Sequence, residues 1–173
     1  MAGKSTSLLK TVEKLKSTSL TMGGVITMRV TENSNSDERK IVKPGSTESF
    51  LFCSRTEWDT GIKDDLFRNC NYYFSRYAFE KGNEWIRTGM DSDVLFIDEI
   101  GGIEMKKDSE HKWDFTLPLG QPRNKKQVLV FSVRDNLVVD FIEKYNCGWK
   151  VLRAEANKDI SDNIISQMQD HLL

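Results

Sequence analysis

The chain has 173 residues, of which 38% are hydrophobic, 10% aromatic and 29% charged. This composition excludes a disordered chain and a membrane protein, and the length is that of one domain over residues 1–173. Lys and Arg number 25 against 26 Asp and Glu, so the net charge of −1 gives no reason to expect nucleic-acid or membrane partners. The three cysteines are scattered and form no C-x-x-C pair. This pattern argues against structural disulfides and a zinc site, and it favours a cytoplasmic location.

The first third of the chain predicts a helix followed by a small antiparallel meander. Leu and Val side chains recur on one face of a helix over residues 5–17, with Ser5 or Thr6 as its N-cap. Short strands separated by polar turns follow this helix. The predicted strands span residues 22–30, 39–43 and 48–54. We expect residues 22–54 to form the meander, whereas residues 55–70 show no clear pattern.

The rest of the chain predicts a parallel sheet covered by helices. A short strand at residues 72–74 and a helix at 75–88 come first. From about residue 90 onward, buried strands alternate with amphipathic helices, which is typical of βαβ crossovers. The predicted strands are 94–97, 128–133 and 150–153, and the predicted helices are 104–115, 137–145 and 160–172.

Two motifs carry chemical meaning, and the first is Gly3-Lys4-Ser5-Thr6 at the start of the first helix. It matches the second half of G-x-x-x-x-G-K-[ST], the phosphate-binding Walker A loop, although so short a motif often occurs by chance. Glycine lets backbone N–H groups curve around phosphate oxygens, and the helix N-terminus adds partial positive charge. A lysine here reaches the β- and γ-phosphates, and a hydroxyl ligates Mg²⁺. All four residues are candidate nucleotide contacts, with Lys4 also catalytic and Ser5 a metal ligand.

The second motif is Asp98-Glu99, which directly follows the apolar run at residues 94–97. Sheets of the α/β class bind their ligands at the carboxyl ends of strands. We assign Asp98 as the Mg²⁺ partner, directly or through water, and Glu99 as the base that orients and deprotonates an attacking water. A strand that merely ends in a polar turn is the alternative. Together the two motifs predict an Mg²⁺-dependent nucleoside triphosphatase.

The segment from Asp98 to Met105, DEIGGIEM, resembles the D-E-I-G-x-[MIL]-E-[LM] signature of the nucleoside-triphosphatase family first described in thermophiles. That family also includes the cancer-related nucleoside-triphosphatase. Residues 24–27 are similar to its G-F-x-T strand, and residues 155–158 to its T-x-E-N-R region. The resemblance implies a RecA-like P-loop α/β sandwich of three layers, with a mostly parallel sheet and an inserted β-meander. It also implies slow hydrolysis of ATP, GTP and related triphosphates to diphosphate and phosphate.

The chain departs from the family pattern at the phosphate loop. The full motif would place its first glycine upstream of Met1, and the family has a strand ahead of the loop. We therefore expect the first strand to be missing from the sheet and hydrolysis to be impaired. The family carries an arginine after its first meander strand, where this chain has Thr31. Arg134 is a weaker candidate for stabilising transition-state charge, and the Asn157–Lys158 loop either touches the base or caps the last helix.

Other functions remain open alongside the triphosphatase. A small-molecule kinase on the same scaffold normally brings an arginine-rich acceptor lid, and the sequence has no arginine cluster. A nucleotide-binding or interaction protein without turnover is compatible with the shortened loop. A regulatory GTPase is disfavoured, because its N-K-x-D motif would need Asp at position 160, where the chain has Ile160.

Overall fold

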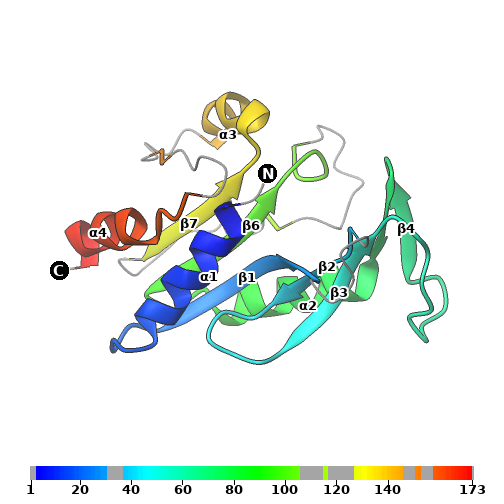
Figure 1. Cartoon of the computed structure of the whole chain (residues 1–173), viewed down its shortest axis with the longest axis horizontal. Helices are drawn as coiled ribbons and strands as arrows, with labels where there is room; N and C mark the ends of the chain where they lie inside the picture. The colour runs from blue at the N-terminus through cyan, green and yellow to red at the C-terminus, as the bar shows by residue number, and fades with distance from the viewer. Residues whose placement is uncertain are drawn as a thin grey trace.

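The structure of the protein is a computed structural model that describes residues 3–30, 37–105, 115–116, 127–145, 151–152 and 158–172. These residues form one mixed sheet with helices on both faces (Figure 1). The strands are β1 (Met22–Arg29), β2 (Arg39–Val42), β3 (Ser49–Ser54), β4 (Leu66–Asn69), β5 (Tyr72–Ser75), β6 (Val94–Ile100) and β7 (Val128–Val133). The helices are α1 (Lys4–Leu15), α2 (Arg76–Thr88), α3 (Val138–Tyr145) and α4 (Ser161–Leu172), with a 3-10 turn, η2 (Asp135–Leu137), before α3.

The sheet has a parallel part and an antiparallel part that meet at β1. Its strand order is β4-β5-β3-β2-β1-β6-β7. β1 pairs with β6 in parallel, and β6 pairs with β7 in parallel, whereas every pairing from β1 outward through β2 to β4 is antiparallel. The carboxyl ends of β1, β6 and β7 therefore lie along one edge of the sheet.

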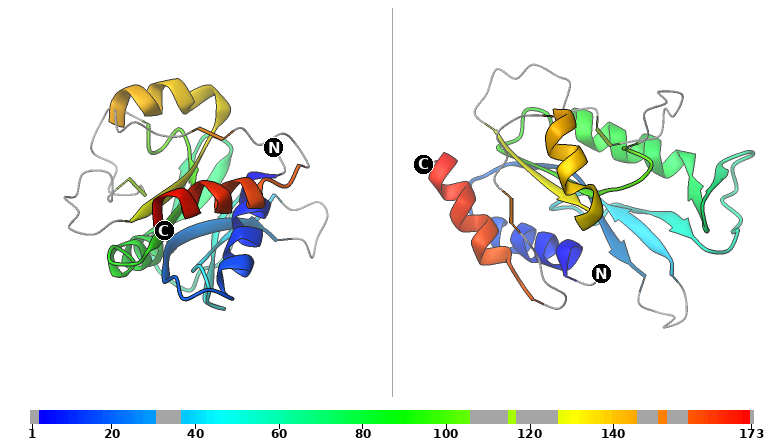
Figure 2. Two further views of the ribbon diagram at one scale, coloured as in Figure 1. Left: turned by 90° about the vertical axis from the view of Figure 1, so that its left-hand side faces the viewer. Right: turned by 90° about the horizontal axis from the view of Figure 1, so that it is seen from above.

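Helices cover the two faces of the parallel part with separate cores (Figure 2). The side chain of Ile26 packs with α1 and α4, whereas that of its neighbour Val25 packs with α2 and α3, as the alternation of a β-strand requires. Along β6, residues 94–97 are all fully buried, because both faces of this strand are covered. The predicted α/β class, a sheet flanked by helices as in P-loop NTPases, is confirmed.

Helix α1 differs from its prediction at one end. Gly3, with a φ of 146°, occupies the N-cap position and no side chain caps the helix there, so neither Ser5 nor Thr6 has the predicted cap role. A backbone in that conformation favours glycine, which has no Cβ to collide with the first turn. At the other end, the Thr18 hydroxyl donates a hydrogen bond of 2.7 Å to the Leu15 carbonyl, just after the last residue of the helix.

The meander is larger than predicted. Residues 55–70, which show no pattern in the sequence, contain β4, and β4 pairs with β5 as a hairpin. This hairpin extends the sheet beyond β3 and packs against α2 through aromatic rings. The rings of Phe67 on β4 and Phe74 on β5 lie 6.0 and 6.2 Å from that of Phe79 on α2.

Several predicted elements need correction or lie outside the described residues. β6 continues through Asp98 and Glu99 to Ile100, so the acidic pair lies within the strand and does not follow it. Residues 151–152 form no strand, because no described strand takes their backbone hydrogen bonds and both side chains are exposed. Most of the predicted 104–115 helix lies outside the described residues. In the described part of the chain, no helix is both long and apolar enough to cross a membrane.

Candidate active site

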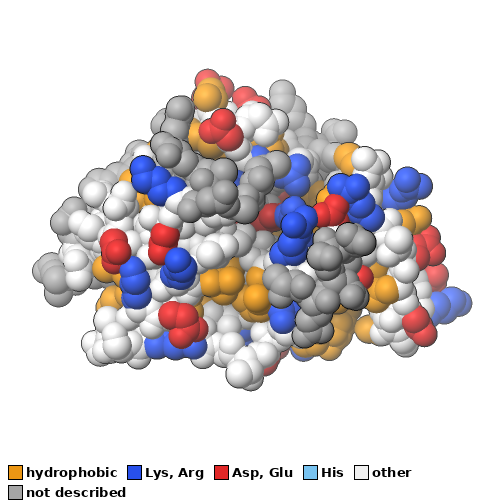
Figure 3. Space-filling model, viewed as in Figure 1, with side chains coloured by type: hydrophobic (Ala, Val, Ile, Leu, Met, Phe, Trp, Pro, Cys, Tyr) orange, Lys and Arg blue, Asp and Glu red, His pale blue; other side chains and the backbone are white. Residues whose placement is uncertain are grey.

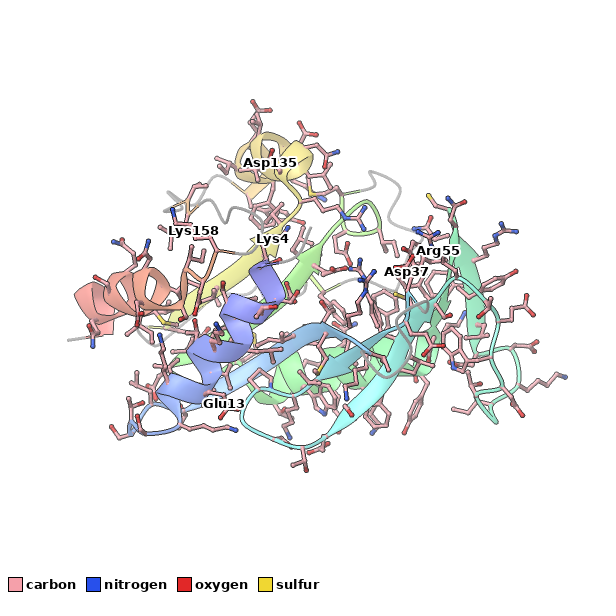
Figure 4. The ribbon with its side chains drawn as sticks, viewed as in Figure 1. Lys4, Glu13, Asp37, Arg55, Asp135 and Lys158 are labelled. Carbon is pink, nitrogen blue, oxygen red and sulfur yellow. The ribbon has the colours of Figure 1, made fainter. Side chains whose placement is uncertain are left out.

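The candidate site lies where the N-terminus of α1 meets the carboxyl edge of the parallel strands. Figure 4 shows Lys4 at the start of α1, below Asp135 and apart from the pair formed by Asp37 and Arg55. The Lys4 ammonium donates a hydrogen bond of 2.7 Å to the carbonyl of Val133, the last residue of β7. A helix N-terminus at this edge of an α/β sheet is suited to bind an anion, since its free N–H groups and partial positive charge point outward.

A β-bulge places the two acidic residues at this edge. Ile97 pairs with Phe131 and Ile100 with Val133, so β6 advances by three residues while β7 advances by two. The extra residue breaks the regular alternation of side chains and turns both carboxylates toward the site. Glu99 lies within the bulge with a φ of 63°, a left-handed conformation that is uncommon for a residue with a side chain. Strain of this kind is typical of functional positions.

The Asp98 carboxylate is fully buried and held by β1. Its Oδ2 accepts hydrogen bonds from the Thr27 backbone N–H at 3.1 Å and the Thr27 hydroxyl at 2.8 Å. Its Oδ1 accepts from the Glu99 backbone N–H at 2.9 Å. Thr27 therefore fixes the orientation of Asp98 and leaves one acceptor position on Oδ1 unused by these contacts.

Positive side chains surround Glu99. Burial raises the pKa of its carboxyl, and the charges of Arg39, Arg134 and Lys4 act in the opposite direction. Arg39 forms an ion pair with Glu99 through Nη1 and Oε1. Basic and acidic side chains accordingly lie side by side near the start of β2 on the face shown in Figure 3. Burial also lowers the pKa of Lys4, while Asp98 and Glu99 raise it.

The segment after the bulge makes a compact turn that explains the rest of the signature. The carboxylate of Glu104 is buried and accepts a hydrogen bond of 2.8 Å from the Gly101 N–H. A Cβ added at Gly101 would lie 3.3 Å from Nε of Arg134, so glycine allows the arginine to pack closely against this turn. The Arg134 N–H also donates to the carbonyl of Ile100 at 3.2 Å. Glu104 is therefore a turn-stabilising residue.

A family model described as NTPase matches residues 1–165. The chain belongs to this NTPase family. The crystal structure of THEP1 from the hyperthermophile Aquifex aeolicus matches this fold with a TM-score of 0.63 and 19% sequence identity, over 97% of this chain and 94% of that one. A search of curated proteins found no match. The predicted resemblance is confirmed, and the protein is a nucleotide-binding P-loop NTPase.

Within this NTPase, the structure brings together most of the predicted site residues. Lys4, Asp98 and Glu99 interact electrostatically with one another, and Arg134 lies among them. Ser5 is half-buried and Thr6 exposed in the first turn of α1. Their roles in catalysis and binding stay predictions. Thr31 and residues 155–157 lie outside the described residues, and Asp159, next to Lys158, accepts a hydrogen bond of 2.9 Å from the Ser161 N–H at the start of α4.

Sequence reasoning missed two residues of this NTPase site. Thr27 appears in the sequence only as part of a resemblance, and its contact with Asp98 spans 71 residues. Arg39 begins β2 and reaches Glu99 across the intervening strand β1. The register of the β2–β3 pairing shifts between residues 39 and 40, and no local pattern in the sequence marks this shift. The alternation of side chains along β2 does not by itself predict the contact of Arg39 with Glu99.

The residues present fit a magnesium ion bound together with phosphates. Among the described residues, no three His, Cys, Asp or Glu side chains gather to hold a metal. Mg²⁺ is commonly bound by one or two carboxylates, several waters and the substrate's own phosphate oxygens. Asp98, with an acceptor position left on Oδ1, has the donor chemistry for such an ion, directly or through a water.

Proposed function

We propose that this NTPase is an Mg²⁺-dependent hydrolase that converts nucleoside triphosphates, ATP and GTP among them, to diphosphate and phosphate. The observation that carries the proposal is the meeting of Lys4, Asp98 and Glu99 at one edge of the sheet, beside the N-terminus of α1. These groups come from residues far apart in the sequence. They supply the cation, the metal ligand and the base that phosphoryl transfer to water requires.

Phosphate binding falls to the first turn of α1. The backbone N–H groups there have no partner within the helix, and their partial charge attracts phosphate oxygens. Gly3 keeps this end free of a Cβ, so that the backbone approaches the phosphates closely. Lys4 would exchange the carbonyl of Val133 for the β- and γ-phosphate oxygens, a stronger partner because they are charged.

The metal-binding role falls to the Ser5 hydroxyl and Asp98. When bound, Mg²⁺ neutralises charge that develops on the phosphate oxygens during transfer. The rigid hold of Thr27 on Asp98 keeps one carboxylate orientation, so no side-chain ordering is needed as the nucleotide arrives. Ser5 lies in the same turn as Lys4, and its hydroxyl is the second ligand that the chain supplies.

The water-activating role falls to Glu99. Burial raises the pKa of its carboxyl toward the range in which a carboxylate accepts a proton from water more readily. The left-handed backbone at this residue turns its side chain away from the regular strand direction and toward the site.

The free thiols of Cys53 and Cys70 fit a reducing compartment such as the cytoplasm.

A nucleotide-binding protein without turnover is the second candidate. Two contacts favour it: Lys4 is bonded to the Val133 carbonyl, and Glu99 is paired with Arg39. If these contacts persisted with nucleotide bound, neither residue would reach the substrate. Binding would then rely on the helix N-terminus alone, and the protein would hold a triphosphate without cleaving it.

Phosphate release with Mg²⁺-ATP and Mg²⁺-GTP tests the proposal. We expect Glu99→Gln to lower kcat by roughly 10²–10⁴-fold, the usual contribution of a positioned base. Lys4→Ala should lower kcat by about 10²-fold or more, because it removes a charge from the phosphate site. Lys10→Ala is the matched control: this lysine lies on the same helix but pairs with Asp159 at the surface. Equal background release by the wild type, Lys4→Ala and Glu99→Gln proteins would reject hydrolysis, and tight binding without release would favour the second candidate.

A further inference from the structure

Arg39 is a charged residue of the site to which neither sequence motif assigns a role. It is the first residue of β2 and therefore belongs to the antiparallel part of the sheet, unlike Lys4, Asp98 and Glu99. Its guanidinium crosses β1 to reach Glu99, and the two side chains retain exposures of 30% and 27%. The pair thus lies at the rim of the site, with one side open to solvent.

In this pairing, Arg39 opposes the catalytic role of Glu99. Its guanidinium occupies Oε1, one of the two oxygens that would accept a proton from water. An empty site with this pair intact therefore holds its base in an inactive form.

A bound triphosphate would offer Arg39 a stronger partner than Glu99. The γ-phosphoryl group carries more negative charge than one carboxylate, and a planar guanidinium binds phosphate through two parallel hydrogen bonds. Lys4 is hydrogen-bonded to Val133, which pairs with Ile100, the residue after Glu99, so a phosphate that contacts Lys4 would come close to the Arg39–Glu99 pair. Arg39 belongs to neither core and keeps 30% of its side chain exposed, so turning toward the phosphate would cost no core contact.

We propose that Arg39 exchanges Glu99 for the γ-phosphoryl group when the triphosphate binds, and that this exchange switches the site on. The proposal rests on the proposed hydrolase function. The freed Glu99 carboxylate accepts a proton from water as the water oxygen bonds to the γ-phosphorus. The bond from that phosphorus to the bridging oxygen breaks, its electron pair leaves with the nucleoside diphosphate, and Arg39 neutralises charge on the equatorial oxygens. Glu99 then releases its proton to solvent.

The exchange predicts a difference between triphosphate and diphosphate binding. Arg39→Ala should weaken binding of the Mg²⁺ complex of the non-hydrolysable imidotriphosphate analogue of ATP by about tenfold. It should leave the Kd of Mg²⁺-ADP within about twofold, since ADP has no γ-phosphoryl group. A merely structural role for Arg39 would change both affinities alike. Arg55→Ala is the matched control, because this arginine also comes from the meander and pairs with a carboxylate, Asp37, at the surface.

Measurements of turnover complete the test. Arg39→Ala should lower the single-turnover rate constant by about 10³-fold. Arg39→Lys should recover part of this loss, because it restores the positive charge but not the planar guanidinium with its two parallel donors. An Arg39→Ala protein as active as the wild type, or with both affinities changed equally, would overturn the exchange.

Failure of this inference is distinguishable from failure of the proposed function. If the wild type hydrolyses nucleotides and Glu99→Gln does not, the hydrolase stands, and the affinities of Arg39→Ala alone decide the exchange. If the wild type binds but releases no phosphate, the hydrolase is rejected, and equal affinities of wild type and Arg39→Ala for the imidotriphosphate would reject the exchange as well. Circular dichroism of Arg39→Ala checks that the variant remains folded.

Discussion

The parallel and antiparallel parts of the sheet build their cores from different side chains. In the parallel part, β6 buries Val94 and Phe96 on one face and aliphatic side chains on the other, and residues 94–97 have no exposed surface. In the antiparallel part, β2 to β5 are mostly half-buried, and aromatic rings pack with α2 on one face. A strand covered on both faces is a continuous apolar run, whereas the antiparallel strands alternate and contribute aromatic rings to the one face that α2 covers.

The two parts also divide the chemistry. The parallel part carries both carboxylates, and α1 brings the lysine to the same edge. The antiparallel part supplies Arg39, which crosses the boundary strand β1 to pair with Glu99. A substitution confined to one part should therefore change stability mainly in that part. The site, in contrast, depends on the register of β1 with both β2 and β6.

The largest effect is expected at Gly24, where the two parallel strands β1 and β6 approach each other. Its φ is +100°, and an added Cβ would lie 1.9 Å from the Phe96 carbonyl oxygen. Gly24→Ala should therefore lower the free energy of unfolding by more than about 4 kcal/mol, measured by urea denaturation. The control is Gly61→Ala in the antiparallel part: its φ of +69° is also left-handed, but nothing lies within 4 Å of the added Cβ. That variant should lose only about 1–2 kcal/mol, and equal losses would contradict the prediction.

A smaller effect, about 3–5 kcal/mol, is expected for Phe79→Ala, which removes the central ring of the meander core. Phe79 is fully buried on α2 and contacts rings from β3, β4 and β5. Amide hydrogen exchange should rise in β3 to β5 and stay low in β6 and β7. Phe141→Ala on α3 is the matched variant for the parallel part, and exchange there should rise in β7. Uniform changes in both variants would show that the two parts unfold together.

The smallest effect is expected for Glu99→Gln on stability. Burial raises the folded-state pKa of Glu99 above its unfolded value, so its contribution to stability is complete below about pH 4.5 and is lost as pH rises through the folded pKa. Glu99→Gln should therefore be more stable than the wild type at pH 8, by an amount on the order of 1 kcal/mol, and the gap should close near pH 4. Thermal melting at both pH values measures this.

The exposed Glu84 provides a control of opposite sign for that measurement. A hydrogen bond from Lys81 lowers its pKa, so its contribution to stability is present above its unfolded pKa and is lost as pH falls. Glu84→Gln should be slightly less stable than the wild type at pH 8. If Glu99→Gln were also less stable at pH 8, the Arg39–Glu99 pair would be a net stabilising contact, and the balance inferred from burial would be wrong.

The sequence predicted most elements of both parts of the sheet, and the errors fall on β4, on the end of β6 and on the predicted strand at residues 150–153. Strand β7 has the predicted bounds, and α1, α2 and α4 begin and end within a few residues of theirs, because long apolar patterns fix them. Strand β4, with the sequence LFRN, is too short and too irregular to show alternation. The predicted end of β6 at residue 97 was wrong, because the polar residues inside the bulge resemble the start of a turn.

The site was predictable where chemistry is local and unpredictable where it depends on pairing. The Gly3–Thr6 motif and the acidic pair each have a local pattern, and the structure brings Lys4 to both carboxylates. The contacts of Thr27 with Asp98 and of Arg39 with Glu99 depend on which strands are neighbours and in what register. No single-sequence pattern encodes a partner 60 or 71 residues away.

The position of β1 has a consequence for the order in which the molecule folds. The hairpins β2–β3 and β4–β5 join neighbouring segments, so closing them costs little chain entropy. The pairing of β1 with β6 joins Met22 to Val94, and the contact of Lys4 with Val133 spans 129 residues. Local contacts form faster than distant ones. The meander is therefore expected to fold first, with β1 as the template on which β6 docks, and the two carboxylates of the site reach their places among the last groups of the chain.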